Sequence, residues 1–155
     1  MIIKAEKSDL EELVSFIQEN GLSAEHVSSN FDNFYLERDS ASNRLVACGC
    51  YVYYHASDNY ADIYEIRSVV VKPEKKMLIG TLTVKIVDFI LTKLREIGAR
   101  ETYAVFDGVK NASFVRLVKR FNGFEDAKKP LHIIPRYRNA GASKTKNKVL
   151  LVREL

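Results

Sequence analysis

Residues 65–74 read EIRSVVVKPE and residues 75–81 read KKMLIGT, and these two adjoining stretches decide the fold. The consecutive valines from Val69 to Val71 are typical of a strand that packs in the interior of a sheet. Pro73 ends that strand, because proline lacks the N–H group that a sheet ladder requires. The sequence therefore predicts a strand, a short turn and then a helix from about Ile79.

The most clearly patterned helix of the chain follows that turn and runs from about Ile79 to Ile97. Its apolar residues recur every three or four positions, as on one buried face of a helix; they are Leu82, Ile86, Val87, Ile90, Leu91, Leu94 and Ile97. Gly98 is placed to end the helix, because glycine readily adopts the left-handed conformation that follows a last turn.

The rest of the chain alternates between further strands and helices, judged from apolar periodicity and turn residues. Strands are predicted at 2–5, 34–37, 45–54, 61–71, 102–106 and 148–152, helices at 10–17 and 111–121, a turn at 55–59 and a mobile loop at 139–146. No internal repeat is present. A chain of 155 residues suffices for one hydrophobic core, so residues 1–155 are predicted to form a single domain.

Charge and composition narrow the classes of partner. The net charge is +4, which suits an anionic ligand without requiring a nucleic acid. The basic excess lies late in the chain and is interpreted as a solvated surface, so nucleic-acid binding is a distant alternative. The chain shows neither a secretory leader nor an apolar stretch of membrane-spanning length, which predicts a cytoplasmic protein without a membrane partner.

The cysteines and histidines do not predict a metal site. Cys48 and Cys50 lie two residues apart in a predicted strand, so they point to one face and are expected to be free thiols. His26, His55 and His132 are far apart in the sequence, and none lies at metal-ligand spacing.

The stretch 65–81 resembles the central strand and phosphate loop of the GNAT superfamily of N-acetyltransferases, especially the amino-acid acetyltransferases of the N-acetylglutamate synthase type. Residues 111–124 are similar to that family's second helix, which contacts CoA, and to its Gly-Phe exit. The resemblance implies an α+β fold with a mixed, mostly antiparallel sheet of six to seven strands and about four helices. It also implies acetyl-CoA as the acetyl donor and a primary amine as the acceptor.

The residues that the resemblance assigns to CoA fall in three segments. They are Val69, Val70 and Val71 on the strand, Lys75, Lys76, Met77, Leu78, Ile79, Gly80 and Thr81 in the loop, and Asn111 at the start of the second helix. A helix N-terminus presents unpaired N–H groups to a pyrophosphate, which is the physical reason for this placement. An N-cap explains Asn111 equally well.

The chain departs from the family pattern in the loop and on the second helix. The loop is one residue shorter, a lysine replaces its arginine, and Leu78 stands in the place of the first glycine. A Cβ atom there limits close approach of the backbone to a phosphate. Val118 stands where many relatives carry the tyrosine that protonates the departing thiolate, so no general acid is assigned; Tyr103 and Tyr137 are candidate substitutes.

Glu65 is the candidate general base, because amine acetylation requires removal of a proton and the family uses a glutamate on this strand. The alternative is a structural ion pair with Arg67, which points to the same face. Arg67 is also a candidate for binding a substrate carboxylate. A backbone N–H near Val70 is the donor that the resemblance implies for the thioester oxygen.

The acceptor side is assigned only by position in the family. Candidate contacts are Phe31, Tyr51, Tyr53 and His132, and the segment 131–133 favours a small amino acid over a protein N-terminus. The resemblance also allows a homodimer. The predicted function is therefore an acetyl-CoA-dependent N-acetyltransferase, with a catalytically inactive CoA-binding or regulatory module as the alternative.

Overall fold

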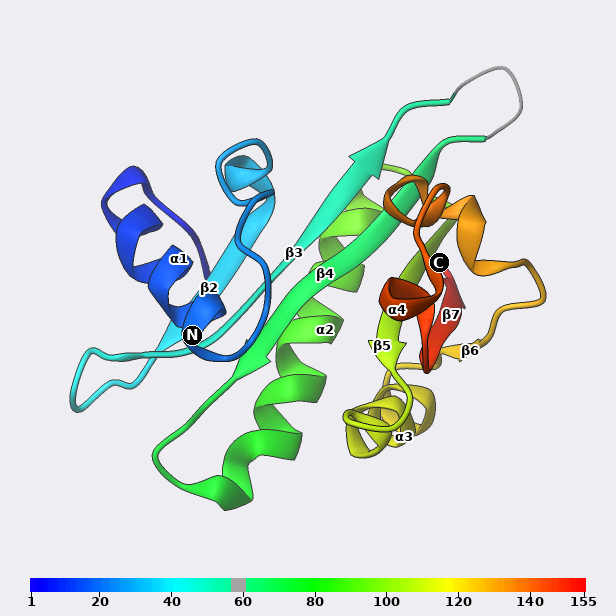
Figure 1. Cartoon of the computed structure of the whole chain (residues 1–155). Helices are drawn as coiled ribbons and strands as arrows, with labels where there is room; N and C mark the ends of the chain where they lie inside the picture. The colour runs from blue at the N-terminus through cyan, green and yellow to red at the C-terminus, as the bar shows by residue number, and fades with distance from the viewer. Residues whose placement is uncertain (57–60) are drawn as a thin grey trace.

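The computed structural model describes residues 1–56 and 61–155. One central sheet carries helices on both of its faces (Figure 1). The described strands form a seven-stranded sheet in the order β1-β2-β3-β4-β5-β7-β6, in which β4 and β5 are parallel and all other pairs antiparallel. They are β1 (Ile3–Lys4), β2 (Phe34–Arg38), β3 (Leu45–Tyr54), β4 (Ile63–Val71), β5 (Glu101–Asp107), β6 (Glu125–Asp126) and β7 (Lys148–Glu154). The mixed, mostly antiparallel sheet predicted from the sequence is confirmed.

The four α-helices of the described residues are α1 (Leu10–Glu19), α2 (Ile79–Glu96), α3 (Ala112–Phe121) and α4 (Ala142–Thr145). Figure 1 shows α2 behind β3 and β4, with α1 in front of the sheet beside β2. Gly21 and Gly98 follow α1 and α2 with φ of 80° and 82°, the left-handed conformation expected after a last helical turn. None of the helices in the described parts of the chain combines the length and apolarity that crossing a bilayer requires.

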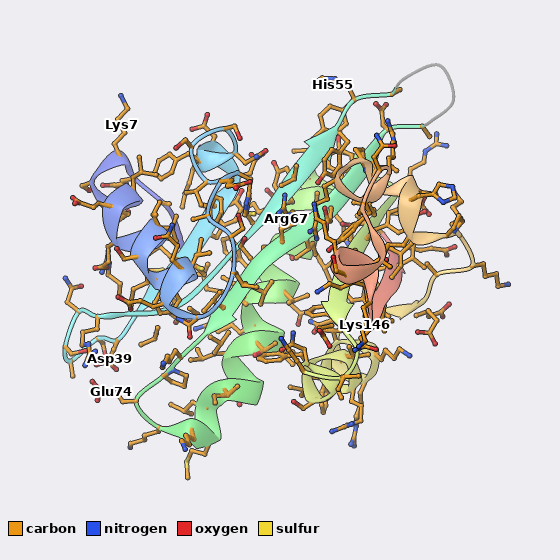
Figure 2. The ribbon with its side chains drawn as sticks, viewed as in Figure 1. Lys7, Asp39, His55, Arg67, Glu74 and Lys146 are labelled. Carbon is orange, nitrogen blue, oxygen red and sulfur yellow. The ribbon has the colours of Figure 1, made fainter. Side chains whose placement is uncertain are left out.

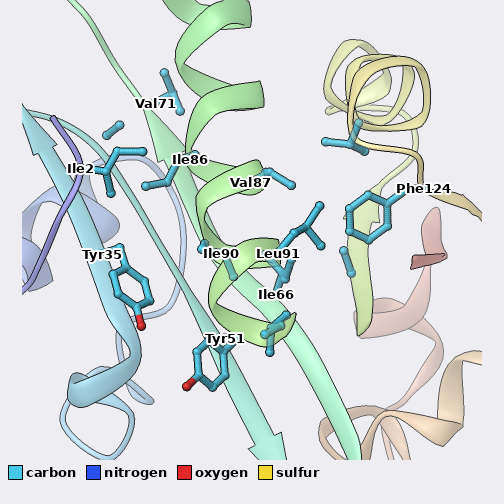
Figure 3. Close-up of a cluster of buried hydrophobic side chains, with 14 of the residues drawn as sticks. Ile2, Tyr35, Tyr51, Ile66, Val71, Ile86, Val87, Ile90, Leu91 and Phe124 are labelled. Carbon is cyan, nitrogen blue, oxygen red and sulfur yellow. The ribbon is translucent and has the colours of Figure 1, made fainter. Parts of the chain in front are cut away.

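The main core lies between α2 and the sheet (Figure 3). Ile86, Ile90 and Leu94 are fully buried, as the apolar periodicity of the helix predicts. Opposite them, Ile66 and Val71 point from β4 into the same cluster. A second core packs on the other face, where α1 contributes Leu13 and Ile17, and a third forms under the C-terminal segment.

Two short elements were not predicted, and one prediction is wrong. β6 has only two residues and therefore no periodicity to read. The segment 139–146 was predicted as a mobile loop, but it contains α4, whose four residues are too few to show a helical pattern. The turn predicted at 55–59 lies largely outside the described residues.

Replacing Ile90 by Ala is expected to lower the free energy of unfolding by about 2–5 kcal/mol, because the cavity left beneath α2 adds to the lost burial. Arg95→Ala, at an exposed position of the same helix, is the matched control and should change it by less than about 0.5 kcal/mol. Urea denaturation of both variants measures this difference. Equal stabilities would contradict the packing described here.

Candidate functional site

The site begins where the two parallel strands separate. β4 and β5 pair only at Glu65 with Tyr103 and at Ile66 with Ala104, although both strands continue well beyond these residues. Beyond Ile66 the two strands diverge, and a cavity of about 530 Å³ opens between their C-terminal halves. An open edge inside a sheet leaves N–H and C=O groups available for an extended ligand, as in strand addition.

A bulge in β4 lies beside this opening. Cys48 pairs with Val70 and Cys50 pairs with Arg67, so the two residues Ser68 and Val69 stand opposite the single residue between the cysteines. Ser68 has a φ of 55°, in the left-handed region that few residues other than glycine adopt. Bulges of this kind re-aim side chains and are common next to active sites.

The cavity is lined by residues from four parts of the chain. They are Asn20, Gly21, Leu22 and Ser23 after α1, Ile66 to Val71 on β4, Val105 to Asp107, Lys110, Asn111 and Phe114 at β5 and α3, and Arg136, Tyr137 and Lys148 from the C-terminal region. Arg67, which Figure 2 places near the centre of the molecule, is one of them. Segments distant in the sequence thus converge on one volume.

The charge of the lining favours an anion. Positive charge comes from four side chains, those of Arg67, Lys110, Arg136 and Lys148. Among the described residues that line the cavity, Asp107 alone is acidic. The Asp107 carboxylate accepts the backbone N–H groups of the loop that follows it, at 2.8 and 2.9 Å. Within the described residues, the Arg67 side chain has no hydrogen bond or ion pair, so its donors remain available to a ligand.

Glu65 is fully buried and is paired with Arg136, not with Arg67. The Arg136 Nη2 and Nε groups donate to the carboxylate at 2.6 and 3.0 Å, and the Tyr54 hydroxyl donates to it at 2.8 Å. Burial opposes the charge of Arg136, but the hydrogen bond and attraction from Glu65 outweigh it, so the pKa of Arg136 is raised. The ion pair of Glu65 predicted as the alternative thus exists, but its partner is Arg136 and not Arg67.

Arg136 connects this ion pair to the cavity. Its guanidinium lies 4.3 Å from the centre of the Tyr137 ring, and its Nη1 donates to the Tyr137 hydroxyl at 2.8 Å. Arg136 and Tyr137 both line the cavity, whereas Glu65 does not. The guanidinium of Arg136 therefore lies between the Glu65 carboxylate and the cavity.

His26 and Ser68 form a second polar pair at the bulge. The His26 Nε2 and Ser68 Oγ atoms are 2.7 Å apart, and Ser68 lines the cavity. Burial lowers the pKa of His26 to about 4, and the positive charges of Arg67 and Arg136 act in the same direction. His26 is therefore neutral at physiological pH.

The amide of Val70 is directed away from the cavity. It faces β3, where Val70 pairs with Cys48, and burial raises the pKa of the Cys48 thiol to about 12. Two residues later, the Lys72 amide donates to the carbonyl of Val46 on β3 at 2.8 Å. Alternation along the strand then turns the Val71 amide toward the opposite edge, which borders the cavity. Cys48 and Cys50 are free thiols, as predicted.

No protein-family model matches the sequence, and no curated protein matches it. Solved structures do match over the whole chain. The N-acetylglutamate synthase from Neisseria gonorrhoeae, complexed with coenzyme A and N-acetyl-glutamate, is 22% identical with a TM-score of 0.71. Rv2747 from Mycobacterium tuberculosis, in complex with CoA, is 17% identical at 0.68, and a ribosomal-protein-alanine N-acetyltransferase from Brucella melitensis is 13% identical at 0.68.

This chain adopts the GNAT fold. It covers 35% of the Neisseria synthase but 99% of each of the other two proteins. The chain therefore spans nearly the full length of those two proteins and about a third of the length of the synthase.

Within the GNAT fold, the cavity brings together only part of the predicted site. Arg67, Val69, Val70, Val71 and Asn111 line it. Asn111 occupies the N-cap position of α3, but its side chain makes no capping hydrogen bond, so capping does not account for it.

The predicted phosphate loop lies beyond the described cavity lining. Lys75 precedes a 3-10 helix, Lys76–Leu78, which leads directly into α2 at Ile79. Leu78 is 41% exposed, so it does not fill the space between the strands. Gly80 faces Leu117 of α3, and a Cβ atom added there would be 3.8 Å from that side chain, an ordinary contact. Met77, Ile79 and Thr81 complete the loop, and Met77 is among the most exposed apolar residues.

The predicted acceptor contacts are dispersed. Tyr51 is buried on the α2 face of the sheet, and Tyr53 stacks there on Tyr64 with ring centres 4.9 Å apart. Phe31 packs against the core under α1, and His132 is exposed on the 3-10 helix Leu131–Ile133. The structure does not bring these four residues to the cavity lining.

Sequence reasoning missed several residues that the structure places at the site. They are His26, Ser68, Lys110, Arg136 and Tyr137 in its polar lining or directly behind it. Tyr137 was considered only as a substitute acid, and Tyr103, the other substitute, donates its hydroxyl to Glu101 instead. The one local signal was the Arg-Tyr pair after Pro135, a residue that favours an ordered turn.

Stability is expected to depend on pH through His26. Its pKa is about 4 in the folded chain and about 6.5 when unfolded, so between these values only the unfolded state takes up the proton. Lowering the pH through this window therefore destabilises the fold, and His26→Gln should reduce that loss. Urea denaturation at about pH 7 and about pH 5 measures it. His132→Gln, at an exposed position, is the control, and identical pH dependence in all three proteins would contradict the prediction.

Proposed function

We propose that residues 1–155 act as one domain, an acetyl-CoA-dependent N-acetyltransferase that acetylates a primary amine. The observation that carries this proposal is the separation of β4 from β5 after Ile66, which opens a cavity bordered by strand edges and basic side chains. An elongated donor with phosphate groups at one end fits such a cavity. Four of the matched solved structures with this fold were determined with coenzyme A.

The residues expected to hold acetyl-CoA lie along one path. Val69 and Val71 line the cavity, and their amides would bind the amide groups of the pantetheine arm like a neighbouring strand. Val71 ends β4 four positions before Lys75, so the path leads to the turn before α2. Lys75 and Lys76 and the first N–H groups of α2 would bind the pyrophosphate there. Asn111 and Lys110 face the donor from the α3 side.

The reaction is a direct transfer. The amine nitrogen forms a bond to the thioester carbonyl carbon, and the carbon–sulfur bond breaks. The departing thiolate takes a proton from water, and it is a stable leaving group because free thiols ionise near pH ~8.5. The amine proton passes to Glu65, directly or through a water molecule. Since both Glu65 oxygens accept hydrogen bonds from Arg136 or Tyr54, this transfer requires Arg136 to move aside or a water to enter.

Arg67 supports an acceptor that carries a carboxylate. Its side chain lines the cavity, lies on the same face as Glu65, and makes no hydrogen bond or ion pair with the described residues. A guanidinium binds a carboxylate through two parallel hydrogen bonds, which fixes the orientation of a small amino acid. The Neisseria synthase in complex with N-acetyl-glutamate is consistent with such an acceptor.

Acetyl-CoA is expected to raise the thermal midpoint of the chain, because a ligand that binds only the folded state stabilises it. Replacing Lys75 and Lys76 together by Gln should weaken its binding about tenfold through loss of charge-assisted contacts. Lys128→Gln with Lys129→Gln removes the same charge from an exposed pair outside the cavity lining and is the matched control. No thermal shift at saturating acetyl-CoA would overturn the proposed function.

Glu65→Gln is expected to lower turnover by about 10²–10⁴-fold at neutral pH if Glu65 removes the amine proton. Release of the free CoA thiol with a panel of amino acids, polyamines and short peptides measures turnover. Because the substitution also breaks a buried ion pair, acetyl-CoA affinity by calorimetry serves as the control for folding and should change little. Equal turnover in both proteins across the pH range would remove Glu65 from the mechanism.

A CoA-binding module without catalysis is the second candidate. Val118, which stands at the position of the family's tyrosine acid, is 1% exposed and packs in the main core. Glu65 is engaged by two protein partners. Tight binding of acetyl-CoA without thiol release toward any amine in the panel would favour this function.

A further inference from the structure

We propose that the Ser68 hydroxyl donates a hydrogen bond to the acyl carbonyl oxygen in the cavity, and that His26 positions this hydroxyl. The inference deepens the acetyltransferase function proposed above and rests on it. It begins with the bulge of β4, where Ser68 lines the cavity and has its Oγ 2.7 Å from His26 Nε2.

The backbone at Ser68 is held in an unfavourable conformation from two sides. A non-glycine residue in the left-handed region is strained, and such strain persists only where the surroundings enforce it. Here His26 holds the side chain, and the Cys48 thiol donates to the Ser68 carbonyl at 3.4 Å. The surroundings thus fix both the backbone and the hydroxyl of this residue.

The hydrogen-bond inventory of His26 determines which atom donates. Within the described parts of the chain, its Nδ1 atom is buried without a partner. A buried N–H without an acceptor is costly, whereas a buried acceptor without a donor is tolerated more readily. The favoured tautomer therefore carries its proton on Nε2 and donates it to Ser68 Oγ. The hydroxyl proton of Ser68 is then available to a ligand.

A role for Ser68 as a nucleophile is opposed by the charges around the pair. It would require His26 to take the hydroxyl proton and become an imidazolium. His26 is half-buried, feels the positive charges of Arg67 and Arg136, and has a pKa of about 4, so the imidazolium is unfavourable at neutral pH. The same argument opposes His26 as the base that deprotonates the amine. A neutral donor–hydroxyl chain is the remaining role.

A side-chain donor also compensates for an amide that is engaged elsewhere. The backbone N–H of Val70, the expected partner of the thioester oxygen, faces β3, because Val70 pairs with Cys48 two positions before the Lys72 amide that donates to Val46. Negative charge that develops on a carbonyl oxygen needs donors already in place, and each one contributes about 10²–10³-fold in rate. Ser68 is two residues away on the same strand and lines the cavity.

Ser68→Ala is expected to lower turnover by about 10²-fold or more with little change in acetyl-CoA affinity. Ser68→Gly is the second variant, because glycine adopts a φ of 55° without strain and the fold is retained. Ser15→Ala makes the same change at an exposed serine of α1, outside the cavity lining, and is the matched control. It should leave turnover unchanged within about a factor of two, as expected when no reacting atom is contacted.

A readout independent of turnover is the infrared carbonyl stretch of bound acetyl-CoA labelled with ¹³C at the thioester carbon. A hydrogen bond to the carbonyl oxygen lowers the stretching frequency, so the bound band should lie below the band in an aprotic solvent and should rise in both Ser68 variants. His26→Gln keeps an N–H at the position of Nε2 and should retain the parent band. His26→Leu removes that N–H and should shift the band as the Ser68 variants do.

The outcomes separate the two proposals. Failure of acetyl-CoA to bind the parent protein overturns the proposed function, and this inference with it. Binding with an unchanged carbonyl band in Ser68→Ala and Ser68→Gly overturns the inference alone. An acetyl group found on Ser68 by mass spectrometry after incubation with acetyl-CoA also overturns it, because the residue would then act as a nucleophile.

Discussion

The bulge in β4 is the constraint on which the rest of the structure depends. Two residues of β4 face Gly49 alone, so the strand changes direction there and cannot follow β5. Gly49, on the neighbouring strand β3, leaves room for α2 to pack there, since a Cβ atom at that position would lie 2.9 Å from Ile90 of α2. The helix α2 can therefore pack closely against the sheet at the bulge. The same irregular pairing of β3 with β4 lies beside the point where β4 and β5 separate to open the cavity.

The buried ion pair between Glu65 and Arg136 links that strand to the C-terminal wall of the cavity. Burying two charges is costly, and the geometry must compensate through several hydrogen bonds. Three contacts from Arg136 and one from Tyr54 satisfy the carboxylate. An apolar pair would stabilise a fold equally well, so such a pair is weak evidence for stability alone. Its effect here is to hold Arg136 and Tyr137 beside the opening between the strands.

The sequence was sufficient for the fold because its signals are local. The valine run, the apolar period of α2 and the glycines after the helices are each read within a short window, and all three are present in the structure. The candidate site was predicted less completely because its contacts are long-range. His26 reaches Ser68 across 42 positions and Arg136 reaches Glu65 across 71, and no periodicity indicates either pairing. Residue type and spacing identified Glu65 but not its partner.

The tyrosines of β3 show what strand register adds to such reasoning. Residues directly opposite each other in an antiparallel pair point to the same face of the sheet. Tyr51 lies opposite Ile66 and Tyr53 opposite Tyr64, whereas Val52 lies opposite Glu65. The two tyrosines therefore belong to the α2 face, and an acceptor held by Arg67 would lie across the sheet from them. A shift of the register by one residue would exchange these faces, so an acceptor contact on this strand follows only from the pairing itself.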